Sequence, residues 1–270
     1  MNESIRAVER ALNILLCFSI NTPELSMTQI SEQVGLHKST VHRLLGTLER
    51  MRFVERDPVS AMYRPGIRLL QMAFLTLEHN DLRRVALPYM HRLRDAHRET
   101  VDLSAMDGAE VIYVEAVESP QRVKLAATTG QRLPAFCTAS GKSIMAFFPD
   151  EKIRQLLEQG MPKYTPCTPQ NPEFFMREMA KIREQGFAIS VEEFEEGINA
   201  VSAPIFDSGR SPIASLAIAG PAYRLSRERM NQISPDLVAA CQSISRELQM
   251  SNSAALAPVS EMMDADEQED

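Results

Sequence analysis

The chain has 270 residues, of which 44% are apolar, so it can bury a sizeable core in one large domain or in two of ordinary size. It contains no run of about 18 apolar residues, and charged side chains between Glu3 and Arg10 break up any apolar signal core, so a cytoplasmic protein without a membrane partner is predicted. Its four cysteines are widely spaced without a C-x-x-C pair, which argues against a disulfide framework or a zinc ribbon and favours buried free thiols.

The formal net charge of −7 is unevenly distributed along the chain. Residues 252–270 hold six acidic side chains and no basic one, so residues 251–270 are predicted to form a disordered acidic tail. Without these six carboxylates the chain has 29 basic and 30 acidic side chains. The segment from Lys38 to Arg64 has six basic and three acidic side chains, and local rather than total charge decides whether a surface meets phosphates.

The first predicted helix covers residues 4–18, and its apolar side chains recur at helical spacing, which predicts one buried face. These side chains are Ile5, Val8, Leu12, Leu15 and Leu16. Ser26 and Gln29 then form the S-x-x-Q pattern of a capping box, in which each side chain bonds the backbone near the other and starts a second helix. Gly35 is predicted to end that helix, because glycine readily adopts the left-handed conformation.

A third helix is predicted from about Lys38 to Met51, with one apolar and one polar, basic face. The apolar face consists of Val41, Leu44, Leu45 and Leu48. Two short helices joined by a tight turn, the second basic on its outer face, are typical of a helix-turn-helix that binds double-stranded DNA. Small hydroxyl residues at the start of this helix allow close approach to phosphates and base edges. The candidate DNA contacts on this helix are Lys38, Ser39, Thr40, His42, Arg43 and Thr47.

Two short strands are predicted next, at residues 53–56 and 62–64, around a turn at Asp57-Pro58. Together they predict the wing of a winged helix, from which Arg64 would contact a neighbouring groove or phosphate. Any small amphipathic three-helix unit has this periodicity, so the spacing alone leaves a purely structural role open.

Three segments carry a more specific pattern: Arg10-Ala11-Leu12, residues 36–45 and residues 53–57. They resemble the N-terminal domain of the IclR family of bacterial regulators. His37 departs from the family, in which many members have proline there, and should affect entry into the helix more than base reading. The resemblance implies a winged helix-turn-helix domain over residues 4–66 and a linker helix over residues 67–80 that helps to pair two DNA-binding units. An ordinary core helix is the alternative for the linker segment.

Beyond residue 80 the apolar pattern alternates between strand and helix periods, which predicts an α+β domain. A helix is predicted at 81–99 and an alternating strand at 100–106, followed by a hairpin at Asp107-Gly108. Further strands are predicted at 110–117, 123–127, 187–191, 198–206 and 212–219. Further helices are predicted at 141–148, 151–159, 173–185 and 226–250.

Six short motifs in this part match the same family: residues 110–114, 130–134, 138–142, 183–187, 203–207 and 220–221. They resemble the GAF-like effector-binding domain of that family, which implies one domain over residues 81–250. With the N-terminal part, the resemblance covers about residues 4–250. It further implies a small-molecule effector and assembly as a dimer or tetramer.

Two sequence features predict where an effector binds. Small side chains share one face of the strand at 212–219 and leave space there, with close packing of a helix as the alternative. The loop at residues 137–142 enters a helix whose free backbone N–H groups suit a carboxylate. Matching to the family places effector contacts at Leu133, Ala139, Ser140, Ile198, Ala200, Ser215, Ala217 and Ala219. Ala217 and Ala219 stand where serine is common in the family, and Phe136 where histidine is common, which predicts a carboxylate effector with an apolar or aromatic body.

Motifs for enzyme activity are weak in this sequence. Gly141-Lys142-Ser143 has the end of a phosphate-binding loop, but the motif requires glycine where Phe136 stands. The five histidines form no metal-ligand spacing with a second ligand type. The acidic cluster at residues 192–196 is interpreted as a solvated strand end rather than a catalytic carboxylate pair. We therefore predict no catalytic residues, no metal and no cofactor.

The sequence thus predicts a transcription regulator of a catabolic operon, and a repressor is favoured over an activator. It would bind an inverted-repeat operator as a dimer or tetramer under the control of a small carboxylate. The alternative from another class is a small-molecule sensor or metabolic enzyme whose N-terminal helices serve only for dimerisation.

Overall fold

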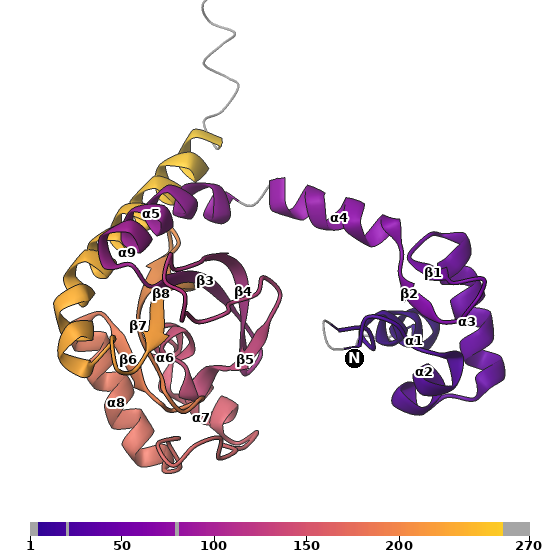
Figure 1. Cartoon of the computed structure of the whole chain (residues 1–270), viewed down its shortest axis with the longest axis horizontal. Coiled ribbons are helices and arrows are strands. Elements are labelled where there is room, and N and C mark those ends of the chain that lie inside the picture. The colour runs from indigo at the N-terminus through magenta and orange to yellow at the C-terminus, as the bar shows by residue number, and fades with distance from the viewer. Residues whose placement is uncertain (1–4, 20–21, 79–80, 256–270) are drawn as a thin grey trace, which may run out of the picture. The chain divides into compact units, whose positions relative to one another are not determined.

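The computed structural model describes residues 5–19, 22–78 and 81–255 and divides the chain into two compact units, Met1–Asn80 and Asp81–Asp270 (Figure 1). Four parts of the predicted domains lie outside the described residues: Ser4 and residues 20–21 of the DNA-binding domain, residues 79–80 of the linker, and residues 256–270 of the tail. Each unit has its own core and is described by itself.

The N-terminal unit consists of helices around one small core and a two-stranded sheet. Its elements are α1 (Arg6–Leu15), α2 (Met27–Val34), α3 (Lys38–Arg50), β1 (Val54–Arg56), β2 (Tyr63–Pro65) and α4 (Ile67–Glu78). The core residues are Ile14, Leu25, Ile30, Val41, Leu45, Leu48, Val54 and Tyr63. The predicted capping box is present, because Ser26 N–H donates to the Gln29 side chain at 2.8 Å and Ser26 Oγ accepts from Gln29 N–H. Gly35 ends α2 with a φ of 64°, as predicted.

The predicted buried face of α1 is wrong for four of its five members. Ile5, Val8, Leu12 and Leu16 are between 53% and 79% exposed, whereas Leu15 is half-buried and packs against the core. The buried residue of α1 is Ile14, which turns toward α2 and α3. The apolar stripe therefore has no partner among the described residues of this unit.

The wing is formed by the antiparallel strands β1 and β2, which place Glu55 opposite Arg64. Asp57 closes the turn between them, because its carboxylate accepts the backbone N–H groups of Ser60 at 2.7 Å and Val59 at 2.8 Å. These bonds stabilise the ionised carboxylate and lower the pKa of Asp57 below its ordinary value. The wing predicted from the Asp57-Pro58 turn is therefore present.

The C-terminal unit is an antiparallel six-stranded sheet with helices on both faces (Figure 1). Its strands are β3 (Thr100–Asp107), β4 (Glu110–Val117), β5 (Arg132–Pro134), β6 (Ala188–Val191), β7 (Ile198–Phe206) and β8 (Pro212–Pro221), in the spatial order β5-β4-β3-β8-β7-β6. Its helices are α5 (Asp81–His97), η1 (Ala135–Cys137), α6 (Ala139–Met145), α7 (Asp150–Leu157), α8 (Pro172–Gln185) and α9 (Arg227–Ala255). This architecture is the predicted α+β class.

Two predicted elements of this unit need correction. Residues 123–127 form no strand, and the carbonyl of Leu125 accepts the Thr100 hydroxyl at 3.1 Å instead of a strand partner. The outer strand beside β4 is β5, which lies further along the chain. Helix α9 continues to Ala255, so the first residues of the predicted disordered tail are helical.

The two faces of the sheet bury separate clusters. One cluster joins α5 and α9 to the centre of the sheet, with Leu103 and Leu216 among its fully buried members. The other joins α6, α7 and α8 to the side of the sheet that carries Val111 and Leu133. The central strand β3 is consequently buried on both faces over its first five residues, so a polar side chain placed there is forced into the interior. No helix in the described part of the chain is long and apolar enough to cross a membrane.

Candidate functional site

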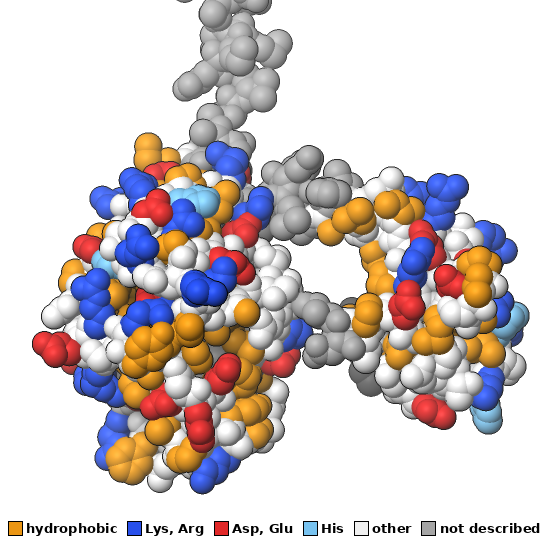
Figure 2. All heavy atoms as spheres, in the orientation of Figure 1, with side chains coloured by type: hydrophobic (Ala, Val, Ile, Leu, Met, Phe, Trp, Pro, Cys, Tyr) orange, Lys and Arg blue, Asp and Glu red, His pale blue; other side chains and the backbone are white. Residues whose placement is uncertain are grey.

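Helix α3 presents the polar face that the sequence predicted. Val41, Leu45 and Leu48 anchor it in the core, which turns the opposite face to solvent. The predicted contacts on that face are exposed, except that Thr40 is half-buried: Lys38, Ser39, Thr40, His42, Arg43 and Thr47. Basic and histidine side chains lie along the edge of this unit where Figure 1 places α3 (Figure 2).

The first turn of α3 is open to an anion. His37 occupies the N-cap without a side-chain hydrogen bond, and its carbonyl accepts the N–H groups of Thr40 and Val41. The N–H groups of Lys38 and Ser39 have no acceptor among the described residues. Free N–H groups at the positive end of a 13-residue helix, next to a lysine, are an arrangement that suits an anion such as a phosphate.

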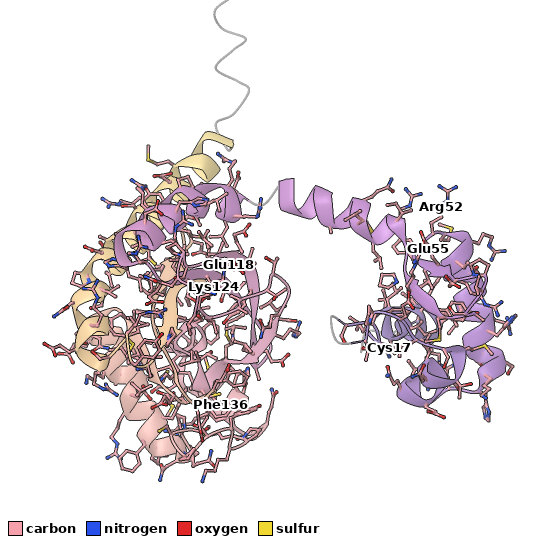
Figure 3. The ribbon with its side chains drawn as sticks, viewed as in Figure 1. Cys17, Arg52, Glu55, Glu118, Lys124 and Phe136 are labelled. Atoms are coloured by element: carbon pink, nitrogen blue, oxygen red, sulfur yellow. The ribbon has the colours of Figure 1, made fainter. Side chains whose placement is uncertain are left out.

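Arg64, the predicted contact on the wing, is exposed and pairs across the two strands at 3.3 Å with Glu55, which Figure 3 labels. Both side chains are about half exposed, so the pair contributes little to stability. Arg64 can therefore exchange Glu55 for a phosphate at small cost.

A cavity of about 100 Å³ lies in the C-terminal unit between the sheet and the start of α6. Seven of the eight predicted effector contacts line it: Leu133, Ala139, Ser140, Ile198, Ala200, Ala217 and Ala219. The eighth, Ser215, is fully buried and donates its hydroxyl to the carbonyl of Ser140 at 3.3 Å. The face of β8 that carries small side chains thus combines the two roles predicted from the sequence. Helix α6 packs against it at Ser215, and the cavity lies at Ala217 and Ala219.

The sequence analysis missed Asp102, an acidic residue of β3 that lines this cavity and is 1% exposed. Its Oδ1 accepts the hydroxyls of Ser104 at 2.8 Å and Ser140 at 3.3 Å. Burial raises the pKa of Asp102 to about 7, against the opposing effect of these hydrogen bonds. The sequence signal for Asp102 was an acidic residue within the otherwise apolar run Val101–Leu103, because acidic side chains are rarely buried in the centre of a β-sheet unless they have a partner.

We expect the free energy of unfolding of the C-terminal unit to fall as the pH rises from about 4 to about 7. The pKa of Asp102 is about 7 in the folded state against an ordinary 3.8, so the folded state binds more protons in this window. The other titratable residues that line this cavity are Tyr113, Cys137 and Glu195. Urea unfolding of wild type and Asp102→Asn at pH 5 and pH 8 checks this, because the variant should gain stability over wild type mainly at pH 8. An equal difference at both pH values would contradict the expectation.

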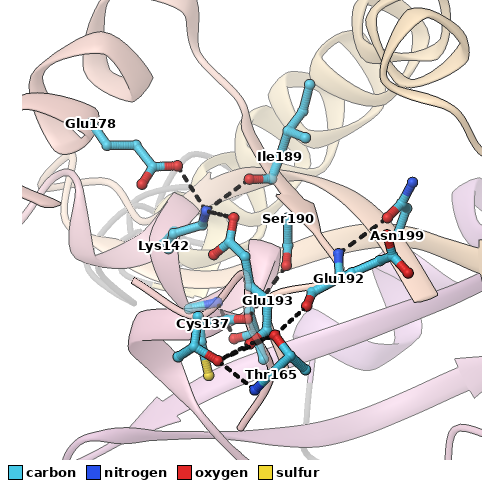
Figure 4. Close-up of polar contacts among 12 residues, drawn as sticks. Cys137, Lys142, Thr165, Glu178, Ile189, Ser190, Glu192, Glu193 and Asn199 are labelled. Carbon is cyan, nitrogen blue, oxygen red and sulfur yellow. Dashed lines mark hydrogen bonds and ion pairs between the residues drawn. The ribbon is translucent and has the colours of Figure 1, made fainter. Parts of the chain in front are cut away.

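Lys142 on α6 is fully buried, and Figure 4 shows its contacts with Glu178, Ile189 and Glu193. Its ammonium donates to the carboxylates of Glu193 at 2.6 Å and Glu178 at 2.7 Å and to the carbonyl of Ile189 at 2.8 Å. Burial raises the pKa of Glu193 to about 7, although the nearby Lys142 charge acts in the opposite direction. The interpretation of this acidic cluster as a solvated strand end is therefore wrong for Glu193, whose side chain is 13% exposed.

Hydrogen bonds and ring contacts, in addition to the ion cluster around Lys142, hold the loop at residues 192–197 beside the cavity. The hydroxyls of Thr165 and Thr168 donate to the carbonyls of Glu192 at 2.6 Å and Glu193 at 2.7 Å. The ring of Tyr164 packs against that of Phe194, at 5.0 Å between centroids, and near that of Phe136, at 6.3 Å. These contacts hold Phe194 and Glu195 at the cavity.

A winged helix with a free, basic helix start, joined in one chain to an α+β unit with a lined cavity, defines a DNA-binding transcription regulator with an effector domain. The chain belongs to the IclR family. Residues 74–246 match the model for the bacterial transcriptional regulator IclR C-terminal domain, and residues 7–58 match the model for the IclR helix-turn-helix domain. The family, fold class and regulator function predicted from the sequence are thereby confirmed.

Curated relatives cover nearly the whole chain. The transcriptional regulator XynR of Escherichia coli is 32% identical over 90% of this chain and 97% of its own. The transcriptional repressor IclR of the same organism is 26% identical over 89% of each chain. These relatives are named as regulators rather than enzymes, in agreement with the predicted lack of enzyme activity. The described residues contain no group of three or more His, Cys, Asp or Glu side chains that could hold a metal ion.

Solved structures share this architecture. An IclR transcriptional regulator from Alicyclobacillus acidocaldarius superposes with a TM-score of 0.82 at 27% identity, over 91% of this chain and all of that one. An IclR homologue from Microbacterium hydrocarbonoxydans, complexed with 4-hydroxybenzoate, superposes with a TM-score of 0.78 at 24% identity, over 89% of this chain and 99% of that one.

Proposed function

We propose that this regulator is a repressor of a catabolic operon that binds an inverted-repeat operator in the cytoplasm and is controlled by a small carboxylate effector. The observation that carries the DNA contact is the start of α3, where free N–H groups, Lys38 and Arg43 are exposed together. In this arrangement the backbone and Lys38 bind phosphates, while the side chains one turn along read base edges. The curated relative IclR is itself named a repressor, which supports the direction of control.

Self-association as a dimer or tetramer supplies the symmetry for an inverted repeat. The exposed stripe of Ile5, Val8, Leu12 and Leu16 on α1 supports pairing of two N-terminal units, because scattered single apolar side chains are ordinary but an aligned row is not. Ile67 and Leu70 at the start of α4 are 46% and 51% exposed and offer further apolar surface. Two paired units reading adjacent half-sites bind far more tightly than one.

The effector would enter the cavity of the C-terminal unit. The N–H groups of Ala139 and Ser140 have no acceptor among the described residues and suit a carboxylate, while Leu133, Ile198 and Ala200 supply an apolar wall. The relative complexed with 4-hydroxybenzoate supports an aromatic acid as the specific candidate. The cavity of about 100 Å³ is smaller than the roughly 150 Å³ that accommodates benzene elsewhere, so an aromatic ring would require the cavity to widen.

Replacing Arg43 with alanine tests the DNA function. We expect the variant to bind DNA from upstream of its own gene more weakly by about 1–3 kcal/mol, which is about 5- to 150-fold in Kd, as measured by fluorescence anisotropy. Arg154→Ala, which removes an exposed arginine from α7 in the other unit, is the charge-matched control and should bind as wild type does. Wild-type protein that binds no such DNA, with or without metabolites, would favour a sensor or enzyme whose N-terminal helices only dimerise.

The effector class is tested in the same assay by adding aromatic acids and short two- or three-carbon acids. Release of DNA by an aromatic acid at micromolar to millimolar concentration is the expected result. Release by the short acids alone would contradict the aromatic candidate, and release by no carboxylate would contradict the carboxylate class.

A further inference from the structure

The cavity is acidic and lacks a positive side chain. Asp102 and Glu195 line it, and no lysine or arginine is among the described residues that line it. Asp102 is 1% exposed, so its charge is not dispersed in bulk water. A ligand that brings only negative charge would meet Asp102 without a compensating cation.

Two buried polar groups at the cavity have unused hydrogen-bonding capacity. Oδ1 of Asp102 is occupied by the hydroxyls of Ser104 and Ser140, whereas its Oδ2 receives no hydrogen bond from any other described residue. Tyr113, 7% exposed on β4, likewise has no partner for its hydroxyl among the described residues. Burial raises the pKa of Tyr113, and the Asp102 carboxylate adds to this effect, so the phenol keeps its proton. Buried polar atoms of this kind are satisfied by a ligand or by water.

We propose that the effector carries a hydroxyl group, which donates a hydrogen bond to Oδ2 of Asp102. This inference rests on the proposed effector function of the cavity and narrows its ligand class to hydroxylated acids. A hydroxyl group suits this position because it can donate a hydrogen bond to Asp102 and also accept one. The Tyr113 hydroxyl can donate a hydrogen bond to an oxygen of the ligand. A carboxylate without a hydroxyl leaves Oδ2 of Asp102 without a hydrogen-bond donor from the ligand, and sites built around buried polar groups reject analogues that leave those groups unpaired.

The protonation state of Asp102 should make binding of the hydroxyl group depend on pH. With a pKa of about 7, the carboxylate is ionised above neutral pH and then accepts a hydroxyl most strongly. The preference for a hydroxylated acid over the matched acid without a hydroxyl should therefore increase as the pH rises through 7, because the carboxylate that both acids share meets the same repulsion. The other titratable groups that face this region are Tyr113 from β4, Cys137 from η1 and Glu195 from the loop, while α6 and β8 present none at the cavity.

Matched probes that differ by one hydroxyl test the inference by isothermal titration calorimetry on the full chain. The pairs are benzoate with 4-hydroxybenzoate and propionate with lactate, and phenol is added as a hydroxylated probe without a carboxylate. We expect wild type at pH 8 to prefer the hydroxylated member of at least one pair by about tenfold or more. Asp102→Ala should abolish that preference and Asp102→Asn should reduce it, because the amide oxygen is an uncharged acceptor. Glu196→Gln, which removes a nearby exposed carboxylate outside the cavity, is the matched control and should retain the wild-type preference.

The outcomes separate the inference from the proposed function. Equal binding within both pairs, or undiminished preference in Asp102→Ala, overturns the role of Asp102. Binding of phenol that depends on Asp102, with no acid bound, supports the hydroxyl contact and overturns the carboxylate effector. Failure of all five probes to bind wild type overturns both. The preference of the wild-type protein for hydroxylated probes, and the dependence of that preference on pH, can be measured without any variant.

Discussion

Replacing Lys142 with methionine is expected to destabilise the C-terminal unit by about 3–5 kcal/mol, because two carboxylates then lose the buried ammonium that pairs with them. Glu193 suffers most, since its side chain is 13% exposed and its Oε2 has no hydrogen bond among the described residues. The Tm of this unit should fall by roughly 10 °C, as measured by differential scanning calorimetry. The loss should be smaller at pH 5.5 than at pH 8, because the raised pKa of Glu193 allows it to take up a proton.

Two further variants make this expectation decisive. Lys181→Met removes an exposed lysine from α8 and should leave the Tm near that of wild type. The double variant with Glu193→Gln should recover much of the stability lost in Lys142→Met, because it removes the unpaired buried carboxylate. A Lys142→Met protein as stable as wild type at pH 8 would show that the ion cluster does not hold the loop at residues 192–197.

Replacing Gly141 with alanine is expected to cost about 1–3 kcal/mol and to abolish effector binding. An added Cβ would lie 2.2 Å from the carbonyl oxygen and 2.3 Å from Cα of Ala135, which is backbone and cannot move aside as a flexible side chain does. Helix α6 would shift away from η1 and displace Ala139 and Ser140 at the cavity. Calorimetric unfolding and effector titration measure the two effects.

Gly46→Ala is the matched control for this substitution, because an added Cβ there meets nothing within 4 Å. Its helical position in α3 should make the alanine stabilising by about 0.5–1 kcal/mol. Gly141→Ala protein with wild-type stability and wild-type effector affinity would contradict the close approach of α6 to η1.

These two residues also explain why the sequence contains part of a phosphate-loop motif. Gly141 permits the close contact of α6 with Ala135, and Lys142 is fully buried in an ion cluster, so neither is free to bind a phosphate. Rejecting the motif on the position of Phe136 gave the correct result. The structural role of the residues became visible only from their long-range partners.

The N-terminal unit was the part most accessible to sequence reasoning. The bond between Ser26 and Gln29 spans three residues, Gly35 acts on its own backbone, and the Asp57 turn bonds residues two and three positions away. Such features are encoded within a few residues, so the pattern predicts them directly. Most of the predicted effector contacts line one cavity for a different reason, since they were placed by family resemblance rather than by local spacing.

By itself the sequence determined the helix-turn-helix, the wing, the basic helix start and the α+β class, because caps, turns and apolar periods are local. Only the tertiary structure decided which surfaces are covered. The apolar stripe of α1 has no cover among the described residues of its unit, whereas Glu193, interpreted from the sequence as solvated, is buried against Lys142. Asp102 lines the effector cavity because β3 is central in the sheet and covered on both faces. Burial depends on segments far apart in the chain, and no local spacing encodes it.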